Sequence, residues 1–140
     1  MPGGRDVLLD TGPLVSVLDA RDQWHERCAA AFPGVVHRCV TTEAVVTEAC
    51  HLALRGGAPA HLPLDFLLAA NIPIVSLPHG GHRRMKTLMA AYDRLPMDYA
   101  DASLVALAEA LRIRTVFTTD RRGFAAYQSA PRSGFTLLPD

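Results

Sequence analysis

Short apolar runs alternate with segments of helical periodicity along most of the chain. Apolar or β-branched stretches at residues 7–9, 37–41, 72–77, 115–119 and 135–138 are typical of buried strands. Between them, apolar positions recur at three- and four-residue steps, which predicts amphipathic helices. This alternation favours an α/β fold in which helices cover both faces of a mainly parallel sheet.

The predicted helices begin and end at recognisable residues. Thr42 is suited to open one helix and Asp22 to cap another, while Gly56 and Gly57 follow the last turn of the first. The full set is expected at residues 14–19, 22–32, 42–54, 58–70, 82–95, 98–112 and 121–127. Since no repeat, low-complexity tract or long linker interrupts the pattern, residues 1–140 are predicted to form a single domain.

Composition excludes some functions and leaves others open. The 14 basic residues balance the 14 acidic ones, so net charge gives no argument for a polyanionic partner, and any such binding needs a local patch. Three cysteines without a CxxC pair argue against a disulfide framework and against a zinc site. No apolar run approaches the roughly 20 residues of a membrane span, and we expect a cytoplasmic protein without a membrane partner.

Four acidic residues stand where secondary structure alone explains them least. Asp10 and Asp120 follow predicted strands, Asp101 lies in the first turn of a helix, and Glu48 lies mid-helix among apolar residues. Ligands of open α/β sheets bind outside the carboxyl ends of the strands, where such side chains can meet. For Asp10 alone, a cap of the following Pro-led helix is an equally good explanation.

Clustered carboxylates repel one another unless a cation neutralises them. Ligands that are all oxygen suit hard divalent ions such as Mg²⁺ or Mn²⁺. An ion of this kind orients and deprotonates a water molecule and stabilises the charge that develops on a phosphodiester. If the four acids converge, they therefore predict metal-assisted chemistry, although their spacing along the chain is weak support by itself.

Four motifs, in this order and spacing, resemble the signatures of PIN-domain nucleases. They read DTGPLVSVLD, VVTEACHLAL, ADASLVALAEAL and VFTTDRRGF, and the greatest likeness is to VapC-type toxins of bacterial toxin–antitoxin modules. The resemblance implies a three-layer αβα fold and a metal-dependent endoribonuclease that cleaves RNA, with Asp10, Glu48, Asp101 and Asp120 as catalytic and metal-binding residues. It further implies accessory roles for Thr11, which matches a small hydroxyl residue of the family, and for Thr119.

Several alternatives stay open at this point. Asp98 is either the N-cap of its helix or a further ligand, and the cap is favoured because caps are commoner. A degenerate PIN fold that serves only as an interaction module is the alternative function. Gly12 argues against a haloacid dehalogenase-type phosphatase, which needs a second Asp there. A receiver domain is disfavoured because paired acids after the first strand are absent.

Partners are predicted from two surfaces. Arg83, Arg84 and Lys86 form the most concentrated basic face, which we expect to contact RNA phosphates. The apolar content of segments 62–70 and 85–92 exceeds what one side of a small sheet needs to bury, which predicts a homodimer. The family resemblance adds a small antitoxin protein as a possible partner, while the sequence identifies neither that partner nor the RNA.

Overall fold

The chain, described by a computed structural model over residues 4–129 and 133–140, forms a parallel sheet flanked by helices. Within those residues the sheet has the strand order β2-β1-β3-β4, and every pairing is parallel. The strands are β1 (Val7–Leu9), β2 (Cys39–Val40), β3 (Thr115–Phe117) and β4 (Thr136–Leu138). The predicted α/β fold with a mainly parallel sheet is confirmed.

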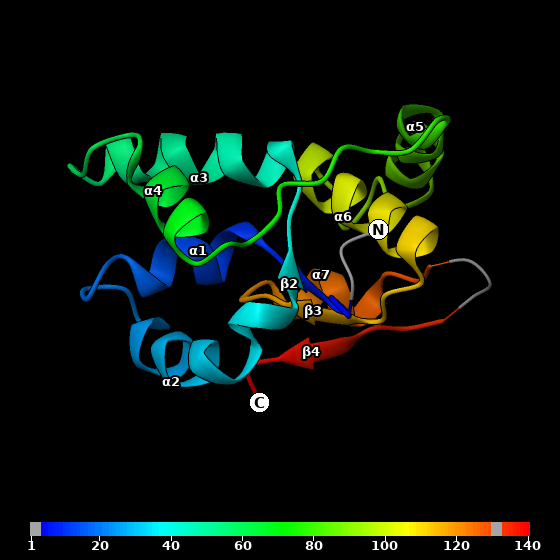
Figure 1. The fold of residues 1–140 in the computed structure, drawn as a ribbon. Helices are drawn as coiled ribbons and strands as arrows, with labels where there is room; N and C mark the ends of the chain where they lie inside the picture. The colour runs from blue at the N-terminus through cyan, green and yellow to red at the C-terminus, as the bar shows by residue number, and fades with distance from the viewer. Residues whose placement is uncertain (1–3, 130–132) are drawn as a thin grey trace.

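The helices occupy the connections that the periodicity predicts. They are α1 (Thr11–Val17), α2 (His25–Val35), the 3₁₀ helix η1 (Val36–Arg38), α3 (Glu43–Arg55), α4 (Leu62–Ala69), α5 (Gly81–Ala91), α6 (Tyr99–Leu111) and α7 (Arg121–Ala126). Figure 1 shows α3, α4, α5 and α6 above the sheet and α2 below it. Thr42 caps α3 as expected, since its side chain accepts a hydrogen bond from the Val45 amide.

The centre of the sheet is apolar on both faces. Val7, Leu8 and Leu9 are fully buried, which is the pattern of a parallel strand covered by helices on both sides. On one side, Phe32 of α2 packs against Phe117 of β3 with ring centroids 4.8 Å apart. Helix α6 is also deeply buried, with every residue from 100 to 108 inaccessible or nearly so. Because α6 and β3 are buried, Asp101 in the first turn of α6 and Asp120 after β3 are held in fixed positions.

Several predicted elements differ in the structure. The helix expected at residues 14–19 spans Thr11–Val17, the helix expected at 82–95 ends at Ala91, and the strand expected at 37–41 is limited to Cys39–Val40 because η1 precedes it. Residues 72–77 form no regular strand but a single parallel bridge between Thr41 and Ile74, because Pro73 has no amide hydrogen to donate. The helix expected from residue 58 begins at Leu62, with Pro63 in its first turn. The helix expected from Asp22 begins at His25, and its N-cap is Trp24, so the predicted cap at Asp22 is wrong.

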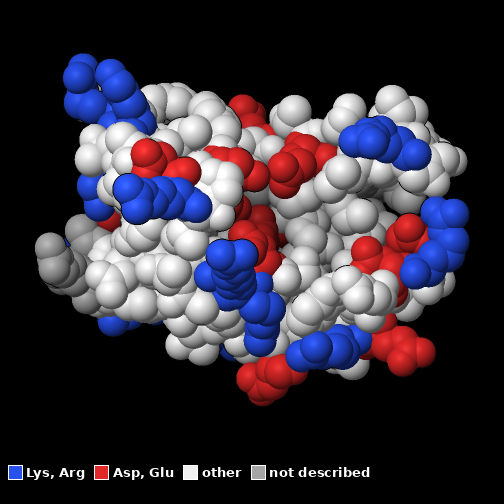
Figure 2. All heavy atoms as spheres, turned by 180° about the vertical axis from the view of Figure 1, so that it is seen from behind, with Lys and Arg blue, Asp and Glu red and all other residues white. Residues whose placement is uncertain are grey.

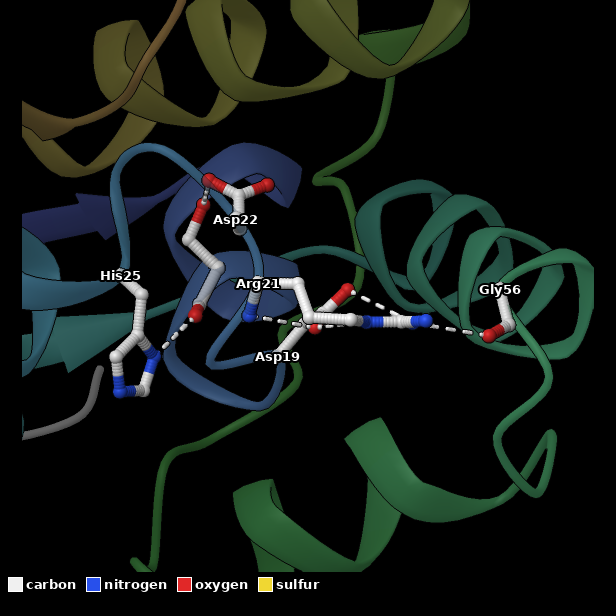
Figure 3. A network of polar contacts seen from close by, with 6 residues as sticks. Asp19, Arg21, Asp22, His25 and Gly56 are labelled. Carbon is white, nitrogen blue, oxygen red and sulfur yellow. Dashed lines mark hydrogen bonds and ion pairs between the residues drawn. The ribbon is translucent and has the colours of Figure 1, made fainter.

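Asp22 instead stabilises the turn between α1 and α2. Its Oδ1 accepts hydrogen bonds from the Trp24 amide at 2.8 Å and the Ser16 hydroxyl at 2.9 Å. Figure 3 shows Asp22 and His25 of this turn, and His25 Nδ1 lies 2.8 Å from the Ser16 carbonyl oxygen. Arg21 pairs with Asp19 and reaches the Gly56 carbonyl at the end of α3. These contacts hold α1, and with it the end of β1, against α3.

The apolar residues that motivated the predicted dimer pack mostly within the single chain. Leu67, Met85 and Leu88 are buried, so the load of α4 and α5 is largely absorbed by the monomer. Among the described residues, the exposed large apolar side chains that remain are Leu52, Leu54, Leu68 and Tyr99. In the described parts of the chain, no helix has both the length and the apolar character required to cross a bilayer.

Candidate active site

Asp10 lies at the carboxyl end of β1 and is only 5% exposed. Its Oδ1 accepts the Thr11 amide at 2.8 Å, and its Oδ2 accepts the Thr118 hydroxyl at 2.7 Å. Burial raises the pKa of the Asp10 carboxyl to about 6, although both hydrogen bonds act to lower it. The negative charges of Glu48 and Asp120 raise that pKa further, which shows that both acids lie within electrostatic reach of Asp10.

Thr118 links the ends of two neighbouring strands. Its buried hydroxyl donates to Asp10 and accepts the backbone amide of Asp120 at 2.9 Å. The Thr119 side chain lies against Gly12, and its accessory role stays a prediction. A Cβ atom at Gly12 would collide with Oγ1 of Thr119, so the glycine is what allows this close approach. Thr118 is therefore the hydroxyl that orients Asp10.

Asp101 is the second buried carboxylate, with 8% of its surface exposed. Asp98 caps α6 by accepting the Asp101 amide at 2.8 Å, and Asp101 Oδ2 faces the Asp98 amide at 3.4 Å in a capping box. The Tyr127 hydroxyl donates to the same Oδ2 at 3.1 Å. Burial, followed by the charges of Asp98 and Asp10, raises the pKa of the Asp101 carboxyl to about 8. The predicted cap role of Asp98 is confirmed, and its role as a ligand stays a prediction.

Asp120 follows β3 and caps α7. Its Oδ1 accepts the Gly123 amide at 3.1 Å, and its charge raises the pKa values of Asp10 and Asp101. A Cβ atom at Gly123 would lie 2.6 Å from Asp120 Oδ2 and 3.0 Å from the Tyr127 hydroxyl. Gly123 thus leaves the space in which Asp120 and Tyr127 approach each other. Burial and the Asp101 charge also raise the pKa of Tyr127, so its hydroxyl stays a donor.

Glu48 approaches from α3 and is half-buried. It lines an open hollow of roughly 410 Å³ together with His51, Asp98 and Tyr99. The four predicted acids therefore come from four elements and lie in one electrostatically coupled region. Figure 2, which views the molecule from behind, shows acidic side chains gathered in the hollowed centre of that face. No Lys, Arg or His of the described chain forms an ion pair with any of the four.

The sequence of residues 7–129 matches the PIN domain family. The chain belongs to the PIN domain family. It is 27% identical over 135 residues to Ribonuclease VapC26 of Mycobacterium tuberculosis, an alignment that covers 95% of this chain and 100% of that relative.

Solved structures support the same fold for this PIN domain. The VapC20 toxin of Mycobacterium tuberculosis, which cleaves the sarcin–ricin loop, superposes with a TM-score of 0.75 at 14% identity, covering 82% of this chain and 90% of that one. A toxin–antitoxin complex from Klebsiella pneumoniae superposes with a TM-score of 0.64 at 18% identity, covering 86% of this chain and 91% of that one. VapBC2 of Rickettsia felis, bound to a promoter DNA fragment, superposes with a TM-score of 0.65 at 12% identity, covering 94% of this chain and 96% of that one.

The acidic region of this PIN domain has donor atoms suited to a hard divalent cation. It presents carboxylate oxygens, and the buried Thr11 hydroxyl beside Asp10 has no hydrogen-bond partner in the described chain. Within residues 4–129 and 133–140, however, no group of three or more His, Cys, Asp or Glu side chains is gathered tightly enough to hold a metal ion. The donor chemistry fits, and the four-carboxylate metal set remains a prediction.

The predicted basic face of this PIN domain is only partly available. Arg84 forms a bidentate ion pair with Glu109, with Nε–Oε1 and Nη2–Oε2 distances of 2.8 and 2.9 Å, whereas Arg83 and Lys86 are exposed. A second cationic group, which sequence reasoning missed, lies beside Asp120. Arg121 donates to the Thr118 carbonyl at 3.3 Å, and its guanidinium lies 5.9 Å from the Trp24 ring centroid.

Thr118, Tyr127 and Arg121 are the residues of this region that the sequence reasoning did not single out. Thr118 and Arg121 both lie in the motif VFTTDRRGF, which extends on both sides of Asp120. The extent of this motif therefore indicated that residues next to Asp120 contribute to the site. Tyr127 lies outside every motif, and only the packing of α7 against α6 brings its hydroxyl to Asp101.

Proposed function

We propose that this PIN domain is a metal-dependent endoribonuclease. The observation that carries the proposal is the burial of Asp10 and Asp101 beside Glu48 and Asp120 without a cationic side chain paired to them in the described chain. Burying a carboxylate without a counter-charge costs stability, so its retention at a site favours a function that needs it. A bound divalent cation is the simplest counter-charge for this group.

Asp10, Asp101 and Asp120 are the residues that we expect to hold Mg²⁺ or Mn²⁺, with Glu48 completing the acidic set. When bound, such an ion supplies a water of lowered pKa and stabilises negative charge on a phosphodiester. The protein's own part is positioning. Thr118 fixes Asp10 through its hydroxyl, and Tyr127 fixes Asp101 in the same way, so neither carboxylate reorganises when substrate arrives.

Single-stranded or looped RNA is the proposed substrate class. A relative of this chain is called a ribonuclease, and another similar structure is that of a toxin that cleaves an RNA loop. Unpaired RNA presents its backbone and bases to a site at the edge of a sheet, whereas a duplex shields them. Arg121, Arg83 and Lys86 are the cations we expect to contact its phosphates.

The proposal extends to a toxin role with an antitoxin protein partner. Two of the similar structures contain a toxin with its antitoxin. A groove between α1, α3 and α4 is lined by the apolar residues Val15, Leu18, Leu52 and Leu62, with Asp19 and Arg21 also in its lining. A groove of this kind fits the apolar face of a partner segment. A homodimer is also proposed, with the exposed Leu68 of α4 as one contact.

The decisive experiment incubates the purified chain with a single-stranded RNA and with a matched duplex, in Mg²⁺, in Mn²⁺ and in excess EDTA. We expect internal cleavage of the single strand that needs the metal and that is lost in Asp10→Asn. Cleavage that continues undiminished in EDTA would refute the metal role.

A second result separates the enzyme from the alternative of an interaction module. If the wild-type chain cuts no RNA under any of these conditions but binds a protein partner as tightly as Asp10→Asn does, the fold serves binding alone. An enzyme with an antitoxin shows cleavage that the partner suppresses.

A further inference from the structure

Tyr99 is a large aromatic side chain left in solvent beside the acidic region. It begins α6 directly after Asp98 and two residues before Asp101, yet 53% of its surface is exposed. The other described tyrosines, Tyr92 and Tyr127, form ring contacts and hydrogen bonds with their neighbours. In the described chain Tyr99 makes neither kind of contact, so no aromatic partner or hydrogen bond occupies its ring.

Two hollows meet at this ring. One, of roughly 410 Å³, contains Glu48, His51 and Asp98 and so opens onto the acidic region. The other has a volume of roughly 230 Å³. Its polar lining residues are Thr42, Glu43, Ser76, His82 and Ser103. Both hollows include Tyr99 and Ala44, so the tyrosine forms the ridge between them. A chain that leaves the acidic region through the first hollow therefore meets Tyr99 before it can enter the second.

The base of the ridge is rigid. Asp98 and Asp101 close a capping box at the start of α6, and the Thr42 hydroxyl lies 2.8 Å from the Ser103 hydroxyl, which joins α3 to α6. Ser103 also donates to the Ala100 carbonyl at 2.6 Å. The position of the Tyr99 backbone relative to Asp101 is thereby fixed, although its ring is free to meet a ligand. A fixed aromatic face is suited to stacking because little order is lost on binding.

The two hollows combine apolar walls with a few polar groups, which suits an unpaired nucleobase because its faces are apolar and its edges are polar. Their rims carry hydroxyl, imidazole and carboxylate groups from Thr47, His51, Asp98, Thr42 and His82, which can hydrogen-bond base edges and sugars. Proteins that recognise unpaired RNA stack its bases on exposed aromatic rings while polar groups read the edges.

We propose that Tyr99 is a stacking platform for an unpaired base of the RNA, next to the phosphodiester that is cut. The inference rests on the proposed ribonuclease function, and it names the residue that selects single-stranded substrate and holds it in register. A base on Tyr99 places the neighbouring phosphate toward Asp101, while the following base enters the hollow beside His82. A paired base is excluded because its faces are already stacked in a helix.

The test measures binding separately from cleavage. Full-length protein carrying Asp10→Asn, in Mg²⁺, is titrated into a single-stranded RNA of about ten nucleotides that contains one 2-aminopurine, whose fluorescence is quenched on stacking. We expect quenching that Tyr99→Ala removes, with binding weakened about tenfold or more. Tyr99→Phe keeps the aromatic ring and is expected to keep both the quenching and the affinity for RNA. Tyr99→Leu keeps an apolar side chain without a ring and is expected to lose the quenching.

Leu54→Ala is the matched control, because it shortens an exposed apolar side chain on α3 that lines neither hollow, so RNA binding should be unchanged. Equal binding and quenching by the Tyr99→Ala and Tyr99→Phe proteins would overturn the inference, as would equal behaviour of Tyr99→Phe and Tyr99→Leu. If the wild-type chain cuts RNA and these variants show no difference, the stacking role fails while the ribonuclease stands. If stacking depends on the ring but no RNA is ever cut, the platform stands and the proposed reaction fails.

Discussion

The acidic edge of the sheet and the basic face of α5 differ in how deeply their charged side chains are buried. The acidic edge consists of Asp10, Glu48, Asp101 and Asp120, and the basic face consists of Arg83, Arg84 and Lys86. Asp10 and Asp101 are almost fully buried, hold a fixed hydrogen-bond partner each, and have raised pKa values of about 6 and about 8. On α5, Arg83 and Lys86 project into solvent, and Arg84 is paired with Glu109. Buried charge is costly and exposed charge is not.

This contrast shows where charge carries information about function. An exposed Lys or Arg costs little wherever it stands, so its presence on α5 says little about function. A buried carboxylate whose pKa is raised opposes folding at neutral pH, and the fold retains two of them together with Thr118 and Tyr127 to orient them. The acidic edge is therefore the stronger indicator of a site, and mutations there should have much larger effects on activity than mutations on α5.

The largest effect is expected from Asp101→Asn. The amide keeps the shape and can still accept from Tyr127, but it removes the charge, so RNA cleavage should fall by about a hundredfold or more. Asp93→Asn, an exposed acid outside the site, is the matched control and should keep full activity. Comparable losses in the two variants would remove the distinction between buried and exposed charge.

The same variant should move stability in the opposite direction. Because the pKa of Asp101 is about 8 in the folded protein against an ordinary 3.8, the folded state holds that proton more tightly than the unfolded state. This contribution to stability is complete below 3.8 and is lost as the pH rises through about 8. In EDTA the wild type should thus melt lower at pH 8.5 than at pH 5, and Asp101→Asn should lose less. A wild-type melting temperature that does not fall across this range would contradict the sign.

Gly123→Ala is expected to have the next largest effect. The new methyl group would lie 2.6 Å from Asp120 Oδ2 and 3.0 Å from the Tyr127 hydroxyl, so the Asp120 carboxylate must shift from its present position. Misplacement of about 1 Å can cost roughly a hundredfold in rate. Gly34→Ala, where an added Cβ meets nothing within 4 Å, is the control for the substitution itself. Single-turnover cleavage rates at saturating metal compare the two, and equal rates would show that Asp120 needs no such placement.

Thr118→Val should cost less, because it removes one hydroxyl but no charge. It leaves Asp10 Oδ2 and the Asp120 amide without their partner, which we expect to lower stability by about 1–3 kcal/mol. Cleavage should fall about 10- to 100-fold as Asp10 loses its orientation. Thr118→Ser restores the hydroxyl and should recover most of both losses. If the serine variant is as impaired as the valine variant, packing and not the hydrogen bond explains the effect.

The smallest effect is expected on α5. Replacing Arg83 and Lys86 by Ala should weaken RNA binding a few-fold and reduce the slope of log affinity against log salt concentration by roughly one for each phosphate that is no longer neutralised. Arg84→Ala should change the slope less, since its charge is already paired with Glu109. Binding titrations at several salt concentrations measure this. An unchanged slope in the double variant would mean that the face is simply solvated.

Some parts of this architecture were predictable from sequence and others were not. Asp10 and Asp120 were found because short apolar runs end directly before them, and parallel strands bring such ends to one edge. Residues 72–77 were predicted to be a strand from their apolar content. In the structure they form a single bridge, between Thr41 and Ile74, because Pro73 lacks the amide hydrogen that a regular strand needs. Thr118 was not identified, because side-chain direction past the end of a strand depends on backbone geometry. Tyr127 depends on a contact between α7 and α6 that no local pattern encodes.

A metal site at the acidic edge can be tested by calorimetric titration of Mn²⁺ into the metal-free wild-type chain at pH 7, repeated in buffers of different ionisation enthalpy. With pKa values of about 8 for Asp101 and about 6 for Asp10, the first carboxyl is mostly protonated at this pH and the second mostly ionised. Cation binding requires ionised carboxylates, so we predict saturable binding that releases about one proton, and its loss in the Asp10→Asn, Asp101→Asn double variant. Equal binding by the double variant would contradict a metal site at these two buried acids, and binding without proton release would contradict the raised pKa of Asp101.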